Sequence, residues 1–341
     1  MTTMQLESRR RYGRERRLFG VAAGVMVMVG LLDLPASLAS ARNPARFAAA
    51  TTRVISNYTG TGISNSHGIT VGPDGALWFT NRGTESIGRI TTAGVVANYT
   101  GPGISFPIGI TSGPDGALWF TNQGSNSIGR ITTAGVVANY SDSRITAPRE
   151  ITSGPDGALW FTNEGSNSIG RITTAGAVSI YPDSLVYGTG FNPEGITVGS
   201  DGALWFTNVV SDSIGRITTA GVVSNYTGTG INDPEGITAG PDGALWFTNW
   251  GNGSIGRITT AGLVSNFAHT GISSPEGITA GPDGSLWFTN YYGNSIGRIS
   301  TTGKVSNYTG TGIRFPAWIT KGPDHAFWFT DGGNNSIGRI S

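Results

Sequence analysis

One fourteen-residue segment recurs along the chain and constrains its fold more than any other feature. Its first copy, GITVGPDGALWFTN, spans residues 68–81. The tryptophan of this segment recurs at Trp78, Trp119, Trp160, Trp205, Trp246, Trp287 and Trp328. The copies are 41 residues apart except for one interval of 45, and a fixed period of this size is typical of one four-stranded propeller blade. We therefore predict an all-β fold, a seven-bladed β-propeller of antiparallel blades.

The turns divide each repeat into four predicted strands. In the first repeat these are residues 69–71, 76–81, 86–90 and 95–99, which we call strands a, b, c and d. Between strands a and b, Pro73 presets the turn and Gly75 accepts a left-handed conformation. Strand b carries Leu-Trp-Phe, which is apolar on both faces, so we expect each sheet to be covered by neighbouring blades on both sides.

The last repeat predicts how the ring closes. It ends at Ser341, just after its strand c at residues 336–340, and has no strand d of its own. A segment that matches strand d, RVISNY at residues 53–58, stands before the first repeat. We predict that this N-terminal strand completes the seventh blade, which removes exposed sheet edges. The predicted domains are an export signal at 1–41, a linker at 42–52 and the propeller at 53–341.

The first 41 residues have the layout of an export signal. Six arginines lie between Arg9 and Arg17, an apolar run from Leu18 to Leu32 follows, and small residues stand at 39–41. The apolar run is shorter than the roughly 20 residues that span a bilayer, so we favour a cleaved signal over a membrane anchor. Residues 16–19, Arg-Arg-Leu-Phe, resemble the twin-arginine export signal. We expect an exported, extracytoplasmic or secreted protein.

Charge and cysteine content restrict the partners of the mature chain. The whole chain has 22 basic and 21 acidic residues, and removal of residues 1–41 leaves 16 and 18, a net charge of −2. No basic excess remains for phosphate binding, so we expect no nucleic-acid partner and, after signal cleavage, no membrane partner. The chain has no cysteine, which excludes disulfides and cysteine catalysis. We expect a monomer.

Residues that occur once in every repeat are interpreted as structural. An aspartate in the Gly-Pro-Asp-Gly turn, represented by Asp74, and an arginine in Ile-Gly-Arg-Ile, represented by Arg89, belong to this class. Function is expected where the copies differ, on the face that carries the d-to-a linkers and the b-to-c loops. At the start of strand a the variable residues are His67, Ile108, Arg149, Glu194, Glu235, Glu276 and Ala317.

Three consecutive repeats carry glutamate at this position, and we predict that Glu194, Glu235 and Glu276 lie on one arc and hold a metal, Mg²⁺ or Ca²⁺. Acidic groups beside aromatic side chains favour a small-molecule or peptide-like ligand at the channel mouth. The predicted ligand-binding residues are Trp250, Tyr291, Tyr292, Trp318 and Arg149. The alternative interpretation is that each glutamate caps its own turn and the aromatic rings pack on loops.

The repeated motifs resemble one enzyme family. Gly-Ile-Thr-x-Gly-Pro-Asp-Gly-Ala-Leu-Trp-Phe-Thr followed by Ser-Ile-Gly-Arg-Ile-Thr is similar to the blades of the streptogramin B lyases, also called virginiamycin B lyases, over nearly all of residues 53–341. The resemblance implies a seven-bladed propeller that opens a cyclic depsipeptide at its ester by elimination. It also implies Mg²⁺ and a histidine base.

The residue-by-residue match identifies His67 as the candidate general base, because it alone occupies a family histidine position. Asn65 and Asn81 stand where the resemblance implies metal-binding glutamates, and neighbouring repeats offer Ala317 and Ile108 where a second histidine is implied. We expect His67 to be solvent-accessible and several blades away from the three glutamates. Two hypotheses follow: a lyase-like enzyme with a rearranged centre, and a non-catalytic extracytoplasmic ligand-binding or interaction propeller on the same scaffold.

Overall fold

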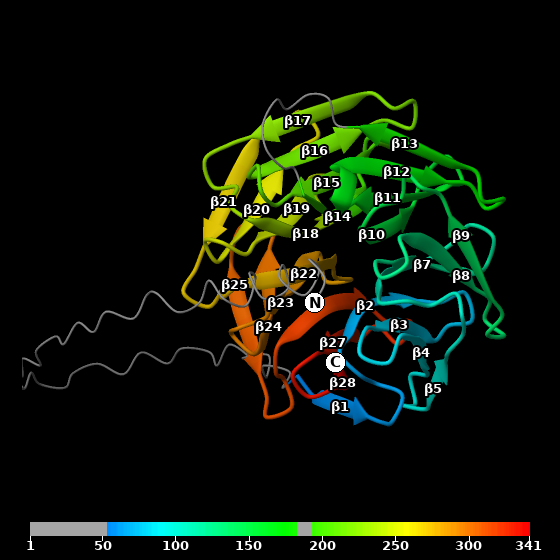
Figure 1. Cartoon of the computed structure of the whole chain (residues 1–341). Coiled ribbons are helices and arrows are strands. Elements are labelled where there is room, and N and C mark those ends of the chain that lie inside the picture. The colour runs from blue at the N-terminus through cyan, green and yellow to red at the C-terminus, as the bar shows by residue number, and fades with distance from the viewer. Residues whose placement is uncertain (1–52, 183–191) are drawn as a thin grey trace, which may run out of the picture. The chain divides into compact units, whose positions relative to one another are not determined.

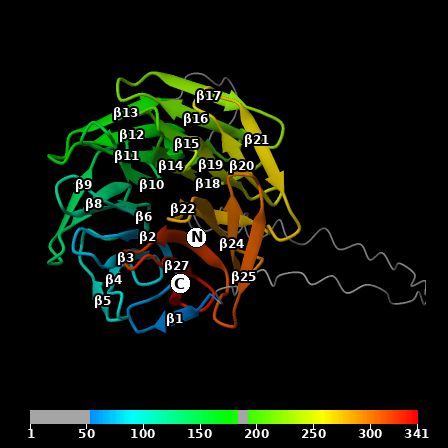
Figure 2. The same ribbon diagram turned by 180° about the vertical axis from the view of Figure 1, so that it is seen from behind.

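The computed structural model of the chain describes residues 53–182 and 192–341. The predicted signal at 1–41 and the linker at 42–52 lie outside the described residues. The described residues form seven four-stranded antiparallel sheets, arranged as blades around a common centre (Figure 1), and Figure 2 shows the same ring from behind. The prediction of a seven-bladed β-propeller is confirmed. Among these residues no helix is both long and apolar enough to cross a membrane.

The four strands of each blade run from the centre of the ring outward. The innermost strands, a, are β2 (Ser66–Val71), β6 (Pro107–Ser112), β10 (Pro148–Ser153), β14 (Pro193–Val198), β18 (Pro234–Ala239), β22 (Pro275–Ala280) and β26 (Pro316–Lys321). Strands b are β3 (Leu77–Asn81), β7 (Leu118–Asn122), β11 (Leu159–Asn163), β15 (Leu204–Asn208), β19 (Leu245–Asn249), β23 (Ser285–Asn290) and β27 (Phe327–Asp331). We number the blades 1 to 7 in this order.

The two outer strands follow the same order. Strands c are β4 (Ser86–Ile90), β8 (Ser127–Ile131), β12 (Ser168–Ile172), β16 (Ser213–Ile217), β20 (Ser254–Ile258), β24 (Ser295–Ser300) and β28 (Ser336–Ile340). Strands d of blades 1 to 6 are β5 (Val96–Tyr99), β9 (Val137–Ser141), β13 (Val178–Pro182), β17 (Val223–Thr227), β21 (Val264–Ala268) and β25 (Val305–Thr309). A short 3-10 helix, η2 (Glu164–Ser166), lies in the b-to-c loop of blade 3.

The N-terminal strand closes the ring as predicted. Strand β1 (Ile55–Thr59) pairs antiparallel with β28, and Tyr58 lies opposite Ile337. The Tyr58 ring stacks on Trp328 of the same blade, with centroids 5.2 Å apart. The corresponding pair in blade 1, Trp78 and Tyr99, has a spacing of 5.3 Å, so the seventh blade reproduces the packing of a blade built from one continuous repeat.

Neighbouring blades bury the strand-b side chains between them. Trp78 of blade 1 packs in one cluster with Leu118 and Phe120 of blade 2, and the other blade pairs repeat this arrangement. The glycine of strand c is required by the same packing, because a Cβ on Gly88 would lie 2.1 Å from the Phe79 ring. Burial of apolar side chains on both sheet faces therefore explains the Leu-Trp-Phe pattern.

The aspartate and arginine that occur once per blade tie the a-to-b turn to strands b and c. In blade 1 the Trp78 indole N–H donates to Asp74 Oδ1 (2.9 Å) and Arg89 Nε donates to Asp74 Oδ2 (2.7 Å). Burial raises the pKa of Asp74, but these hydrogen bonds outweigh it and lower the pKa below its ordinary value. The equivalent residues make the same contacts in the other blades, which supports their structural interpretation.

Candidate active site

A repeated hydrogen bond places the variable residues of the seven strands a on one level. The Gly68 N–H donates to Thr80 Oγ1 (2.9 Å), and the Thr80 hydroxyl donates to the carbonyl of Ile108 in the next blade (2.7 Å). The last of these bonds, from Thr330 to the His67 carbonyl (2.7 Å), closes the ring. The residues held in this way, which we call the inner ring, are His67, Ile108, Arg149, Glu194, Glu235, Glu276 and Ala317.

The b-to-c loops and the d-to-a linkers lie on the same face of the propeller, as predicted. In blade 1 the N–H of Arg82 donates to the Asn65 carbonyl (3.2 Å). The N–H of Trp250 reaches the Asp233 carbonyl (3.0 Å) in the same way in blade 5. Because strand a begins at this linker, the inner ring lies near the face that carries the sequence differences between blades.

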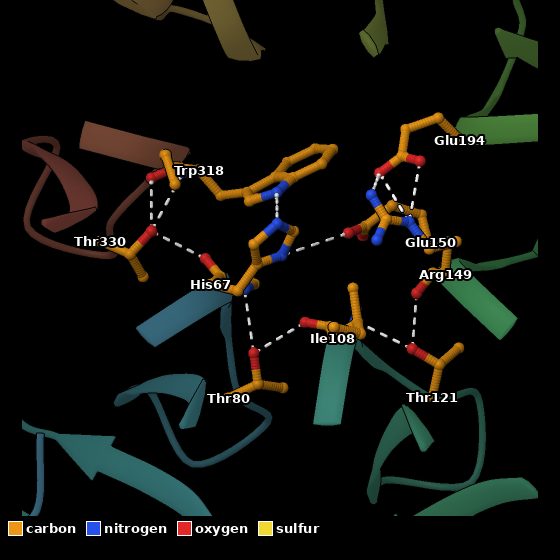
Figure 3. Close-up of polar contacts among 12 residues, drawn as sticks. His67, Thr80, Ile108, Thr121, Arg149, Glu150, Glu194, Trp318 and Thr330 are labelled. Atoms are coloured by element: carbon orange, nitrogen blue, oxygen red, sulfur yellow. Dashed lines mark hydrogen bonds and ion pairs between the residues drawn. The ribbon is translucent and has the colours of Figure 1, made fainter. Parts of the chain in front are cut away.

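His67 occupies the centre of a cluster drawn from four blades (Figure 3). The Trp318 indole N–H donates to His67 Nε2 (3.2 Å). His67 Nε2 lies 3.6 Å from Glu276 Oε1. Figure 3 shows Glu150 beside the other ring nitrogen, with His67 Nδ1 3.8 Å from Glu150 Oε1. The imidazole therefore has a carboxyl group near each of its nitrogens.

Two expectations about His67 were wrong. The side chain is buried and not solvent-accessible, because only 5% of His67 is exposed. It also lies beside Glu276, one of the three glutamates from which it was expected to be separated. The reason is geometric: all seven strands a adjoin one narrow centre, and blade 7, which separates blades 6 and 1, contributes the small Ala317 at this level.

Glu150 is a site residue that the sequence analysis missed. It occupies the position that is glycine in five blades, where in blade 1 an added Cβ on Gly68 would come within 2.6 Å of the Ile108 carbonyl. Only blades 3 and 7 depart from Gly-Ile-Thr, with Glu150 and Trp318. Both Glu150 and Trp318 contact His67. The replacement of the repeated glycine was therefore the sequence signal for these two site residues.

Arg149 and Glu194 form a buried ion pair in the inner ring. Arg149 Nε donates to both carboxylate oxygens of Glu194 at 2.8 and 2.9 Å, and Nη2 also donates to Oε1. Glu164 Oε2 lies 3.4 Å from the same Nε. Burial disfavours the charged guanidinium, but Glu194, Glu164 and Glu235 outweigh this and raise the pKa of Arg149. Arg149 therefore has an internal partner.

The surroundings of Glu150 perturb its carboxyl group. Burial raises the pKa of its carboxyl well above the ordinary range. The charges of Glu194 and Glu276 raise it further, and only Arg149 opposes the shift. Burial and the neighbouring glutamates therefore both favour the protonated form of the Glu150 carboxyl.

The three glutamates predicted as metal ligands differ in their surroundings. Glu194 is engaged by Arg149, whereas Glu276 lies against His67. Across residues 53–182 and 192–341 no three His, Cys, Asp or Glu residues are grouped so that they could hold a metal ion. Mg²⁺ and Ca²⁺ prefer several converging oxygen ligands, and the residues present do not fit that requirement. A bound divalent cation stays a prediction.

Most of the predicted aromatic residues form one cluster on the same face. The rings of Trp250, Tyr291 and Tyr292 lie 5.0–5.4 Å apart between centroids. Phe315, which the sequence analysis did not single out, stacks on Tyr291 at 5.2 Å. Trp318 instead contacts His67, with ring centroids 5.7 Å apart. Of the predicted aromatic ligand-binding residues, Trp250, Tyr291 and Tyr292 thus belong to one cluster, and Trp318 contacts His67.

Comparisons with known proteins place this chain in a family. The model of the virginiamycin B lyase family matches residues 45–229 and 184–341. A solved streptogramin B lyase is 34% identical with a TM-score of 0.79, and the match covers 85% of this chain and 97% of that one. A catalytically inactive histidine-to-alanine variant of virginiamycin B lyase from Staphylococcus aureus, solved with quinupristin, is 35% identical with a TM-score of 0.79, covering 85% and 99%.

Other comparisons concern the fold or find nothing. Kuenenia stuttgartiensis hydrazine synthase is 18% identical with a TM-score of 0.68 over 83% of this chain and 97% of that one, which shows the propeller fold alone. A search of curated proteins finds no match. The family model and the two lyase structures agree over the whole propeller, and the chain therefore belongs to the virginiamycin B lyase family.

Proposed function

We propose that this protein binds a cyclic, peptide-like ester at the inner ring and opens it by elimination, with His67 as the general base. The observation that carries the proposal is the position of His67, which lies at the centre of the ring between Glu150 and Glu276. Membership in the virginiamycin B lyase family supports the substrate class and the type of reaction.

The geometry around His67 suits proton transfer. In an elimination the base removes a proton from the carbon next to a carbonyl, and the electron pair of that C–H bond forms a double bond to the adjacent carbon. The bond between this adjacent carbon and the ester oxygen breaks, and the carboxylate leaves with the electron pair of the broken bond. An Nδ1–H directed at Glu150 would leave the Nε2 lone pair as the base, and the nearby carboxyl groups would stabilise the imidazolium that forms. Because Trp318 donates to Nε2, its indole must release this nitrogen when substrate binds.

The aromatic cluster of Trp250, Tyr291, Tyr292 and Phe315 supports binding of a bulky ligand. It lies on the face where the b-to-c loops meet the d-to-a linkers. Stacked aromatic rings bind apolar side chains and cations through their faces. We assign it to substrate binding together with Trp318, and Arg149 to holding Glu194 in place.

The test is incubation of the mature protein with quinupristin, followed by chromatography and fragmentation mass spectrometry. Elimination gives a linear product of unchanged mass, whereas hydrolysis adds the mass of one water. We expect His67→Ala to lower kcat by about 10²–10⁴ in a protein that still folds. His325→Gly, in an a-to-b turn on the opposite face, is the matched control and should retain activity. Full activity of His67→Ala would remove the base from the mechanism.

The alternative function is a ligand-binding propeller without catalysis. The observation in its favour is that Nε2 of the buried His67 already accepts the Trp318 indole N–H. If quinupristin binds with a measurable Kd but stays cyclic during prolonged incubation, and Trp250→Ala weakens that binding, this alternative replaces the lyase.

We also propose that the protein is exported and acts outside the cytoplasm as a monomer. The arginine-rich, apolar N-terminal segment supports export. Cell fractionation with N-terminal sequencing of the mature chain tests localisation, and sedimentation tests the monomer. Retention of an intact N-terminus in the cytoplasmic fraction would contradict export.

A further inference from the structure

The b-to-c loop of blade 5 contains the only Asn-Gly pair in the sequence, Asn252-Gly253. The pair lies between β19 and β20, in the same loop as Trp250 of the aromatic cluster. Asparagine is a thermolabile residue, because its side-chain amide can be attacked by the main-chain nitrogen of the residue that follows it. Glycine as the following residue favours this attack, since it has no Cβ to hinder the approach and its backbone is conformationally permissive.

The structure leaves both reacting groups of this pair accessible. Asn252 is exposed and Gly253 is half-buried. Within residues 53–182 and 192–341, neither the Gly253 N–H nor the Asn252 amide N–H₂ donates a hydrogen bond to another residue. The Ser254 hydroxyl, which lies between two amide oxygens, donates to Asn252 Oδ1 (2.5 Å). This hydrogen bond draws electrons away from Cγ, the atom that a nucleophile attacks.

The other asparagines of the b-to-c loops are held by hydrogen bonds and are followed by larger residues. Asn334, at the same position in blade 7, donates its amide N–H₂ to the Gly312 carbonyl (3.0 Å) and to Asp331 Oδ2 (3.2 Å). Asn335, which follows it, accepts the Asn65 N–H at 2.8 Å. The same kind of bond, from the N–H of the next d-to-a linker, holds Asn126, Asn167 and Asn294.

We propose that Asn252 is a site of spontaneous modification, at which the side-chain amide is converted to a carboxylate through a cyclic imide. The Gly253 main-chain nitrogen gives up its proton to hydroxide and attacks Asn252 Cγ. A bond between this nitrogen and Cγ forms, the bond between Cγ and Nδ2 breaks, and ammonia leaves. Water then adds to one of the two imide carbonyls and opens the ring. Opening at Cγ gives aspartate, and opening at the main-chain carbonyl gives isoaspartate.

Modification of this residue should disturb the aromatic cluster. Isoaspartate lengthens the main chain by one carbon, within a short loop whose start is fixed. The N–H groups of Trp250 and Gly251 each donate to a carbonyl of the d-to-a linker, at 3.0 and 3.3 Å. The Trp250 ring in turn lies 5.4 Å from the Tyr291 ring between centroids. We therefore expect the isoaspartate form to lose part of the packing that holds this loop.

The test is peptide mapping by mass spectrometry, after incubation of the mature protein in mildly alkaline buffer made with heavy-oxygen water. A synthetic peptide of residues 250–257 is incubated beside it and gives the rate without a fold. We expect the Asn252 peptide of the protein to take up one heavy oxygen atom and to contain isoaspartate, while the Asn334 peptide stays unmodified.

Two variants serve as matched controls. Asn252→Ser, with the residue that blades 2 to 4 have at this position, should show no uptake of heavy oxygen in this loop. Gly253→Asn should slow the uptake several-fold. This substitution is compatible with the backbone, because Gly253 has a φ of 61° and Asn126 adopts a φ of 52° at the same position in blade 2.

Several results would overturn the inference. An unmodified Asn252 at the time when the synthetic peptide is fully converted would show that the folded loop protects this amide. Equal uptake at Asn334 would refute the selectivity assigned to hydrogen bonding, and an unchanged rate in Gly253→Asn would refute the role of glycine.

The effect on the aromatic cluster has its own readout. The converted wild-type protein should melt at a lower temperature than Asn252→Ser incubated for the same time, and equal melting temperatures would refute the coupling to Trp250. None of these measurements uses ester opening, so the inference stands or falls independently of the proposed lyase activity.

Discussion

Asp331 gives the sharpest test of the physical reasoning, because it is the one acid at a position that is asparagine in the other six blades. In blade 1 the Asn81 amide N–H₂ donates to the Gly62 carbonyl (2.8 Å) and its oxygen accepts the Ser64 N–H (3.1 Å). The Asp331 carboxyl accepts the Arg314 N–H at 2.9 Å but has no N–H₂. Asn334 instead donates to the Gly312 carbonyl (3.0 Å) and to Asp331 Oδ2 (3.2 Å).

The electrostatic cost of Asp331 can be worked from its pKa. Burial raises this pKa from 3.8 to about 7, against the lowering effect of the hydrogen bonds from Arg314, Asn334 and Ser336. Because the folded-state pKa is above the unfolded one, the bound proton stabilises the fold at low pH, and this contribution is lost as the pH rises through about 4 to 8. Allowing for partial solvation, the loss is roughly 2–4 kcal/mol.

We therefore predict that Asp331→Asn stabilises the propeller at pH 8 by roughly 2–4 kcal/mol and has little effect near pH 4. The assay is urea unfolding of wild type and variant at a series of pH values. The difference between their free energies of unfolding is followed, because the turn aspartates titrate in both proteins. Asn290→Asp is the reverse change in blade 6, where Gly293 stands in place of Asn334. Because the donor that lowers the Asp331 pKa is missing there, the variant should show a pH dependence of the same sign and at least the same size. A pH-independent difference, or a variant less stable at pH 8, would refute the reasoning.

Three further changes test the packing. Arg149→Met or Glu194→Met alone should destabilise the fold by about 3–5 kcal/mol by removing the main partner of a buried charge, and the double variant should lose less than the sum in a thermodynamic cycle. Gly88→Ala should cost about 1–3 kcal/mol in urea unfolding, because its Cβ meets the Phe79 ring; wild-type stability would contradict this contact. Removal of residues 53–59 should expose the edge of β28 and cause aggregation in light scattering, whereas a monomer with the wild-type melting temperature would refute ring closure.

The sequence by itself determined the architecture. The period of the tryptophans predicted seven blades, and the unmatched strand at residues 53–58 predicted how the ring closes. Both predictions succeeded because they depend on local pattern, on turn residues such as Gly75 and on two-sided apolar strands. The same symmetry predicted that Glu194, Glu235 and Glu276 lie on one arc, and equivalent hydrogen bonds from strand-b threonines hold all three carbonyls.

Only the tertiary structure decided which of these residues meet. Blade order suggested that His67 and Glu276 are distant, but strands that are separated along the ring all adjoin its narrow centre. Glu150 was missed because the variable residue of its repeat, Arg149, stands directly before it. Glu194 was predicted to bind a metal because its partner Arg149 lies 45 residues earlier in the sequence. A repeat pattern specifies the strand position from which each side chain projects. Contacts across the centre depend on the size and charge of all the side chains that project into it, and so they follow only from the folded ring.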